Sequence, residues 1–163
     1  MKPWLPLLAL ASLAAAAPAL AQNAGQIARV QGGANCPGCN LFQAELSGAE
    51  IGPRNLSRSR LRQSNMSLAV MSRASFAGAD LRDVDAYGGV FTGANFSGAD
   101  MTNASFVGTY LQGANFRGAK LRGANFSGAE MQRAVGLTQG QLNAACGDSE
   151  TQLPAGLRIP ACR

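Results

Sequence analysis

The chain has 163 residues and a formal net charge of +5 at pH 7, with no histidine and charged side chains at 14% of positions. Histidine is the commonest general base and metal ligand, and few carboxylates are present to replace it. The composition therefore argues against an enzyme, and it predicts neither a metal site nor a cofactor.

The first residues have the composition of a secretory signal. Lys2 precedes an apolar run at 5–17 that is too short to cross a bilayer, and small residues follow at Ala19 and Ala21. We therefore expect residues 1–21 to be a signal peptide, and no later segment is apolar for long enough to span a membrane. Removing 21 residues from 163 leaves 142, the length of one domain, exported to a periplasm or the extracellular space.

Four cysteines form an even set, and an oxidising compartment favours disulfides over thiol chemistry. Cys36 and Cys39 enclose Pro-Gly, the residues that a type II turn prefers at its central positions. Such a turn brings its outer residues within disulfide range. A redox or metal site is the alternative interpretation of this C-x-x-C pattern, but haem attachment requires histidine where Asn40 stands, and zinc requires further ligands nearby.

An apolar residue recurs at every fifth position through the middle of the chain, with no insertion or deletion across the run. Two places before most of these central residues lies alanine or serine, and the other positions are mostly polar or glycine. The central residues are Leu41, Leu46, Ile51, Leu56, Leu61, Met66, Met71, Phe76, Leu81, Ala86, Phe91, Phe96, Met101, Phe106, Leu111, Phe116, Leu121, Phe126 and Met131.

Neither a helix nor a flat strand fits this period. An α-helix turns by about 100° per residue, so a five-residue period moves successive apolar groups around the helix by about 140°. A strand alternates its side chains with period two, so an odd period sends them to opposite faces. Short extended pieces joined by bends do fit, and glycine two places after the centre tolerates the positive φ of such bends. The sequence therefore predicts an all-β solenoid.

The recurring A-(D/N)-(L/F)-x-x motif, clearest in ANFSG, ADMTN, ANFRG and AKLRG, resembles the pentapeptide-repeat family over about residues 39–133. The resemblance implies a right-handed quadrilateral β-helix with four pentapeptides per coil, so nineteen centres give about five coils. We expect an N-terminal cap at 22–38, the β-helix at 39–135, and a C-terminal helix and tail at 136–163. Some family members protect DNA gyrase by imitating acidic duplex DNA. A basic, exported chain does not fit that role, so we expect no nucleic-acid partner.

The five-residue period ends after Ala134. Thr138 and Gln141 have the spacing of a capping box, which predicts a short helix at about 139–146. The remaining residues have no regular period, and we expect them to fold back over the last coil. A Cys146–Cys162 disulfide would hold this tail in place.

Disulfide connectivity is limited by the length of the rod, roughly 20–25 Å at about 4.8 Å per coil. Pairing an N-terminal cysteine with a C-terminal one would require about three times the allowed Cα separation. Of the three pairings, we therefore favour Cys36–Cys39 with Cys146–Cys162. Arg54 occupies an inward position near the first of these pairs, so we expect either a backbone bulge or a side chain that turns outward.

Outward positions suggest two surfaces. One side stacks five cations into a predicted anion-binding stripe, although Asp80, Asp83 and Asp100 interrupt it and a solvated mixed-charge face is the alternative. A second side stacks three apolar residues, which we expect to contact a protein partner or a second copy of the chain. The cations are Arg60, Arg62, Arg82, Lys120 and Arg122, and the apolar residues are Val70, Val90 and Tyr110.

The sequence leaves two functions open. The first is an exported, non-enzymatic scaffold or interaction module whose partner the sequence does not name. The alternative is a binder of an anionic envelope component, such as lipopolysaccharide, an anionic lipid or a polysaccharide, through the cationic stripe.

Overall fold

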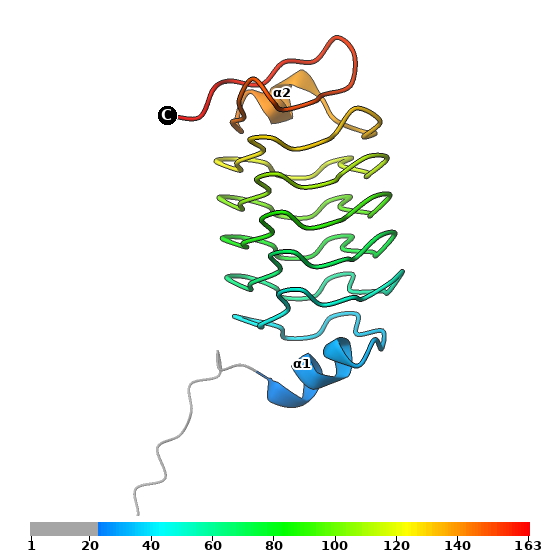
Figure 1. Ribbon diagram of the computed structural model, residues 1–163. Helices are drawn as coiled ribbons and strands as arrows, with labels where there is room; N and C mark the ends of the chain where they lie inside the picture. The colour runs from blue at the N-terminus through cyan, green and yellow to red at the C-terminus, as the bar shows by residue number, and fades with distance from the viewer. Residues whose placement is uncertain (1–22) are drawn as a thin grey trace, which may run out of the picture.

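The computed structural model describes residues 23–163, so the predicted signal peptide lies outside the described residues. The chain forms a rod of stacked coils with helix α1 (Ala24–Gln31) at one end and helix α2 (Gln139–Leu142) at the other (Figure 1). Between them the backbone pairs through single parallel β-bridges rather than through longer strands. Within the described residues no helix is both long and apolar enough to cross a membrane.

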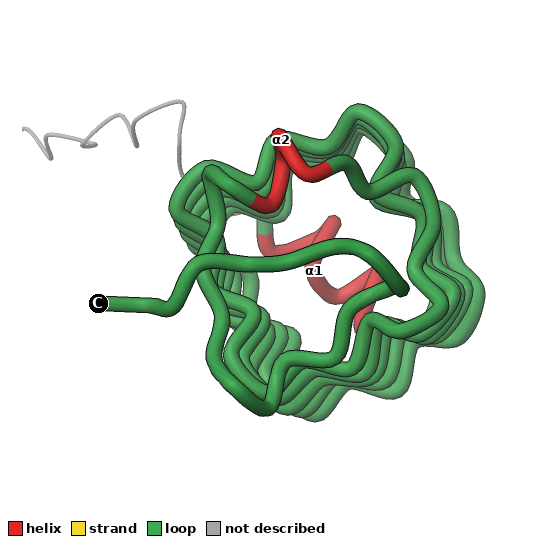
Figure 2. Tube along the Cα trace, turned by 90° about the horizontal axis from the view of Figure 1, so that it is seen from above, coloured by secondary structure: helices red, strands yellow, loops and turns green. Residues whose placement is uncertain are grey.

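The register of the bridges defines the coil. Residues twenty apart are paired, from Asn40 with Arg60 to Asn115 with Val135. Twenty residues are four pentapeptides, and the rod viewed along its axis has four sides (Figure 2). We name the sides by their central residues: side A from Leu41 to Leu121, side B from Leu46 to Phe126, side C from Ile51 to Met131, and side D from Leu56 to Phe116.

The central residues fill the interior of the rod, as the period predicts. Phe96 is fully buried and stacks between two phenylalanines of its own column, with centroid distances of 5.2 Å to Phe76 and 5.4 Å to Phe116. Two further phenylalanines approach the same ring, Phe91 from the neighbouring side C with a centroid distance of 5.9 Å and Phe106 from the opposite side B with a centroid distance of 5.7 Å. Aromatic rings arranged in this way stabilise one another beyond the area they bury.

The bends between the sides take a positive φ, as expected for the position two places after each centre. Gly98 has a φ of 66° there. Where a residue with a side chain occupies this position the backbone keeps the same conformation, with φ of 59° at Gln63 and 57° at Leu68. The register of the coil therefore imposes the left-handed conformation even on residues that ordinarily avoid it.

The N-terminal cap contains a helix that the sequence analysis missed. Asn23 accepts a hydrogen bond from the backbone N–H of Gln26 at 3.1 Å and so caps helix α1. Val30 is fully buried against the first coil. The Gln26 side chain also accepts a hydrogen bond from the backbone N–H of Asn40 at 2.6 Å. The helix thus covers the core and pairs part of the open edge of the first coil.

Arg54 and the first disulfide lie beside this helix. Arg54 turns outward rather than entering the core, and its Nε donates to the backbone oxygen of Gly33. The predicted turn and disulfide are both confirmed, because Cys36 and Cys39 are bonded with their Cα atoms 5.5 Å apart. Gly38 has the positive φ, 69°, that a type II turn requires after proline.

The predicted C-terminal helix is shorter than expected. The Thr138–Gln141 capping box is present, but the helix ends at Leu142 rather than near Cys146. Cys146 instead returns to an extended conformation, because the open edge of the last coil supplies hydrogen-bond partners. Its N–H donates to Ala124 at 2.9 Å, and its carbonyl oxygen accepts from Phe126 at 2.8 Å.

The tail crosses the open end of the rod (Figure 2), as the sequence analysis predicted. The Cys146–Cys162 disulfide is also confirmed, with a Cα separation of 4.8 Å. A further bridge pairs Glu130 with Gln152, so the tail adds hydrogen bonds to the last coil as well as covering its core.

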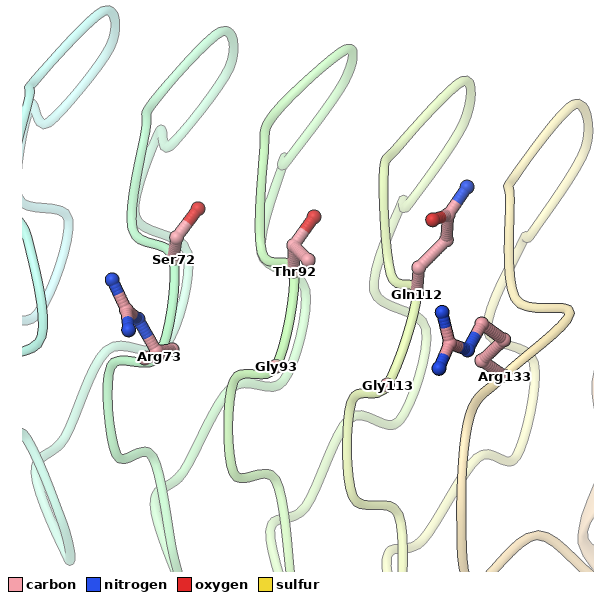
Figure 3. A pocket seen from close by; sticks show the side chains of 7 residues that line it. All are labelled: Ser72, Arg73, Thr92, Gly93, Gln112, Gly113 and Arg133. Atoms are coloured by element: carbon pink, nitrogen blue, oxygen red, sulfur yellow. The ribbon is translucent and has the colours of Figure 1, made fainter.

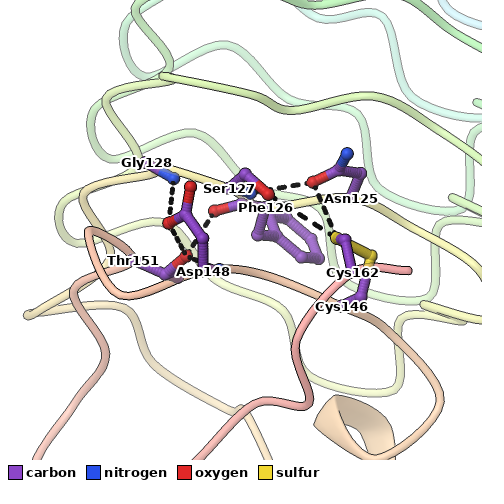
Figure 4. Close-up of a disulfide and its surroundings, with 8 residues drawn as sticks. All are labelled: Asn125, Phe126, Ser127, Gly128, Cys146, Asp148, Thr151 and Cys162. Atoms are coloured by element: carbon purple, nitrogen blue, oxygen red, sulfur yellow. Dashed lines mark hydrogen bonds between the residues drawn. A yellow bond between two sulfur atoms is a disulfide. The ribbon is translucent and has the colours of Figure 1, made fainter.

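Asp148 links the tail to the last coil (Figure 4). Its carboxylate accepts hydrogen bonds from the backbone N–H of Gly128 at 2.8 Å, from Thr151 at 3.0 Å and from the backbone N–H of Glu150 at 3.0 Å. The Gly128 hydrogen bond contributes most to holding the pKa of Asp148 below its usual value.

Asp148→Asn is expected to lower stability at neutral pH. The lowered pKa means that the wild-type carboxylate stabilises the fold above its unfolded pKa of about 3.9 and loses this effect as the pH falls through the folded pKa. Urea unfolding of both proteins between about pH 7 and pH 3 checks this expectation. The difference between the two midpoints should be largest near neutrality and shrink under acid, and a difference independent of pH would contradict it.

Candidate functional site

The structure brings the five predicted cations onto side A. The bridges place Arg60, Asp80, Asp100 and Lys120 in one column in successive coils. The three remaining arginines lie two residues further along the same side, in the neighbouring column: Arg62, Arg82 and Arg122.

Three of these five cations are paired with carboxylates. Arg82 contacts Asp80 at 2.6 Å and forms the shortest of the pairs. Arg62 lies 3.3 Å from Asp83, and Lys120 lies 3.6 Å from Asp100. The hydrogen bond from Arg82 is the largest influence that lowers the pKa of Asp80, and Asp80 in turn raises the pKa of Arg82. The aspartates thus offset much of the positive charge on this side.

The other two cations of side A differ from each other. The guanidinium of Arg60 lies over the ring of Phe42, 5.3 Å from its centroid, which is a cation–π contact. Arg122 is exposed and has no carboxylate within ion-pair distance among residues 23–163. The anion-binding stripe stays a prediction, and its geometry favours ion pairs within the rod.

Side C carries the predicted apolar column. Val70 pairs with Val90, and Val90 pairs with Tyr110, in successive coils. Val70 and Tyr110 are 39% and 46% exposed, whereas Val90 is less exposed and half-buried. Glu50 and Glu130 continue the same column at its two ends.

Two exposed apolar residues next to this column were missed by the sequence analysis. Leu68 and Tyr87 are 61% and 55% exposed, and the N–H of Leu68 donates to the carbonyl oxygen of Tyr87 at 2.8 Å. They lie at the end of side B, at the bend before the side C column. Comparing the end of each pentapeptide with the start of the next would have found them. We call the five residues together the apolar corner: Leu68, Val70, Tyr87, Val90 and Tyr110.

A shallow groove of about 590 Å³ runs along the other edge of side C (Figure 3). Arg73 and Arg133 lie at its two ends, and Gly93 and Gly113 lie between them where larger residues would fill the space. The remaining lining residues are the polar side chains Ser72, Thr92 and Gln112.

A second groove of about 660 Å³ lies on side D and shares Arg73 with the first. Arg54 and Arg58 line it together with Asn55, Ser57 and other residues. Since Arg73 borders both grooves, the two form one continuous polar surface across the bend between sides C and D. We call this surface the arginine groove. It is not evident from any single column of the sequence, because its arginines come from two sides of the coil.

The chemistry of these surfaces suits binding. Among residues 23–163 no group of three or more histidine, cysteine, aspartate or glutamate side chains could hold a metal ion. The apolar corner can bury area against another protein, and the arginine groove offers guanidinium groups beside hydroxyls and amides.

Comparison with known proteins identifies the repeat. A family described as pentapeptide repeats matches in eight copies, over residues 55–85, 81–118 and 90–128. A search of curated protein sequences found no match.

The solved structures that resemble the chain include two pentapeptide repeat proteins with 28% and 26% sequence identity. A pentapeptide repeat protein from the Arabidopsis thaliana thylakoid lumen is 28% identical, with a TM-score of 0.62 over 71% of this chain and 83% of that one. HetL, a pentapeptide repeat protein from the cyanobacterium Nostoc involved in heterocyst differentiation regulation, is 26% identical, with a TM-score of 0.50 over 79% of this chain and 61% of HetL. These neighbours imply a right-handed quadrilateral β-helix.

Proposed function

Because the chain belongs to the pentapeptide-repeat family, we propose that it is an exported, non-enzymatic scaffold that binds a protein partner through the outer surface of side C. The observation that carries this proposal is the apolar corner. Leu68 and Tyr87 are each more than half exposed, and they adjoin a column of three further apolar residues. A continuous apolar patch on a polar rod is typical of a protein interface.

The residue types of the apolar corner support a protein partner. Tyrosine is enriched at interfaces, since its ring buries a large apolar area while its hydroxyl can still form a hydrogen bond. Tyr87 and Tyr110 supply two such rings. The corner presents its side chains on rigid backbone, because Val70, Val90 and Tyr110 are bridged in successive coils and the N–H of Leu68 donates to the carbonyl oxygen of Tyr87. Little conformational freedom is therefore lost when a partner binds.

The charges around the corner indicate the chemistry of the partner. Glu50 and Glu130 end the column that contains Val70, Val90 and Tyr110. Four coil spacings separate the two carboxylates, or about 19 Å along the rod. A matching partner surface would have an apolar strip of about 10 Å, the two coil spacings from Val70 to Tyr110, and two basic residues about 19 Å apart, one beyond each end of the strip.

The proposal that the chain is exported rests on observations other than the apolar corner. The Cys36–Cys39 and Cys146–Cys162 disulfides suit a periplasm or the extracellular space. The predicted signal at residues 1–21 supports the same location. A similar rod is found in a thylakoid lumen, which is also reached by crossing a membrane.

The non-enzymatic role rests on the filled core and the composition. Phenylalanine, leucine and methionine occupy the interior, and the chain has no histidine. Asp80, Asp83 and Asp100 on side A contact cations of the same side. Such paired carboxylates are poorly placed to act as general bases.

Site-specific photo-crosslinking in the exporting cell tests the proposed interface. A photoreactive phenylalanine analogue replaces Tyr87 in one variant and Ser97, on side D, in a control. We expect Tyr87 to give a discrete adduct, either a dimer of the chain or a complex with one other protein. The Ser97 variant should give none, because it lies away from the apolar corner.

A second substitution makes the result specific. Leu68→Ser should remove the Tyr87 adduct, because it replaces the most exposed apolar side chain of the corner. The proposal would be wrong if Tyr87 and Ser97 gave the same adducts, or if neither gave any while both variants accumulated as folded protein.

A further inference from the structure

The arginine groove concentrates unpaired positive charge. Arg58, Arg73 and Arg133 are exposed, and none has a carboxylate within ion-pair distance among the described residues. In contrast, Arg62 and Arg82 on side A each contact an aspartate. Three exposed arginines without a carboxylate partner therefore lie along the groove on sides C and D.

Glycines open this surface. A Cβ atom added at Gly93 would lie 3.3 Å from Cγ of Arg73, and one at Gly78 would lie 3.6 Å from Cγ of Arg58. The glycine one coil further on thus leaves room for each arginine stem. At the far end, the side chain of Arg133 leans toward Gly113 (Figure 3).

We propose that the arginine groove binds a linear carbohydrate chain that carries negative charges along its length. Three coil spacings separate Arg73 from Arg133, or about 14 Å. A ligand that contacts both arginines must therefore be extended along the rod and anionic at more than one point. This binding surface is separate from the apolar corner and does not depend on the proposed protein interface.

The lining between the arginines favours a carbohydrate. Ser72, Thr92 and Gln112 border the groove on side C, and Asn55 and Ser57 border it on side D. Hydroxyl and amide groups can exchange hydrogen bonds with sugar hydroxyls, while guanidinium groups bind carboxylates or sulfates with two parallel hydrogen bonds. The floor at Gly93 and Gly113 has no side chain to bury an acyl chain, so a lipid anchor is disfavoured.

Isothermal titration with linear galacturonate oligomers tests the proposal on the oxidised protein. Affinity should rise from the monomer to the hexamer, because only longer oligomers can reach from Arg73 to Arg133. It should also fall with added salt, since exposed charges are screened. The Arg58→Gln/Arg73→Gln/Arg133→Gln variant should bind the hexamer about tenfold more weakly.

A control variant removes the same amount of charge elsewhere. Arg60→Gln/Arg62→Gln/Arg122→Gln acts on side A and should leave the affinity for the hexamer within about twofold. Similar losses in the two variants would assign the binding to overall charge and overturn the proposal.

A second pair of variants leaves every arginine in place. Gly113→Asp adds a carboxylate to the floor of the groove at a positive φ, which aspartate tolerates better than most residues. Its matched control is Gly108→Asp, where φ is 64° and an added Cβ meets no atom within 4 Å. Only Gly113→Asp should weaken binding.

Three results would overturn the proposal: no measurable binding of the hexamer by wild-type protein, equal affinities for monomer and hexamer, or binding only to vesicles that contain an anionic lipid. The last result would identify a membrane surface as the ligand. None of them affects the crosslinking test at Tyr87, so the two proposals can fail separately.

Discussion

Phe96→Ala is expected to lower the free energy of unfolding by about 3–5 kcal/mol, the largest effect of any single substitution considered. Phe96 is fully buried and stacks on Phe76 and Phe116 above and below. Phe91 of the adjacent side C and Phe106 of the opposite side B pack against the same ring at steep angles, 58° and 84° between the ring planes. The cavity would therefore adjoin four aromatic rings that the stacked backbone holds apart, and it could not collapse without moving whole coils.

Phe42→Ala is the matched control for this substitution. Phe42 is also a phenylalanine within a coil, but it points outward beneath Arg60. Its removal should cost no more than about 1 kcal/mol. Urea unfolding followed by circular dichroism measures both effects. Equal losses at the two positions would contradict the account of a core built from stacked rings.

Removing the C-terminal disulfide is expected to have the second largest effect. Cys146→Ser/Cys162→Ser opens a loop with a sequence separation of 16, which corresponds to about 3 kcal/mol in the chain-entropy description. The tail held by this disulfide covers the last coil, where Glu130 is bridged to Gln152. Once the tail is released, an open β edge becomes available to pair with other molecules.

The variant should therefore aggregate as well as unfold earlier. Light scattering under mild denaturant, measured beside urea unfolding, separates the two effects. Cys36→Ser/Cys39→Ser is the control, because its separation of 3 corresponds to only about 2 kcal/mol in the same description. Helix α1 still covers that end of the rod. Aggregation of the control to the same extent would contradict a specific role for the tail.

The strict period made the interior of the rod predictable. Each centre from Leu41 to Met131 is buried, because a five-residue period with a bend permits only one inward arrangement. The outward turn of Arg54 was also predictable, since an unpaired guanidinium in such a core is too costly. Both disulfides followed from the length of the rod.

The ends of the rod were harder to predict, because they have no period. Helix α1 contains only Ile27 and Val30 as a spaced apolar pair after the Asn23 cap, which is a weak signal in so short a segment. The predicted helix after Thr138 was too long, since the hydrogen bonds offered by the last coil draw Cys146 out of the helix.

The surfaces were only partly predictable. Aligning positions twenty residues apart correctly placed Arg62 and Arg82 on one side of the rod. The alignment could not show that their side chains reach Asp83 and Asp80. The apolar corner and the arginine groove both extend across bends between sides. Residues such as Leu68 and Arg73 belong to surfaces that no single column contains.

The central claim is that the rod binds anions through the arginine groove, whereas the cations of side A are largely paired within the fold. The most direct test is an amide chemical-shift map of the labelled, oxidised protein titrated with the galacturonate hexamer, because one spectrum reports on all four sides. We predict that the shifts change around Arg73, Gly93 and Gly113 on the arginine groove. Changes centred on Arg62, Arg82 and Arg122 would instead assign binding to side A and contradict the claim.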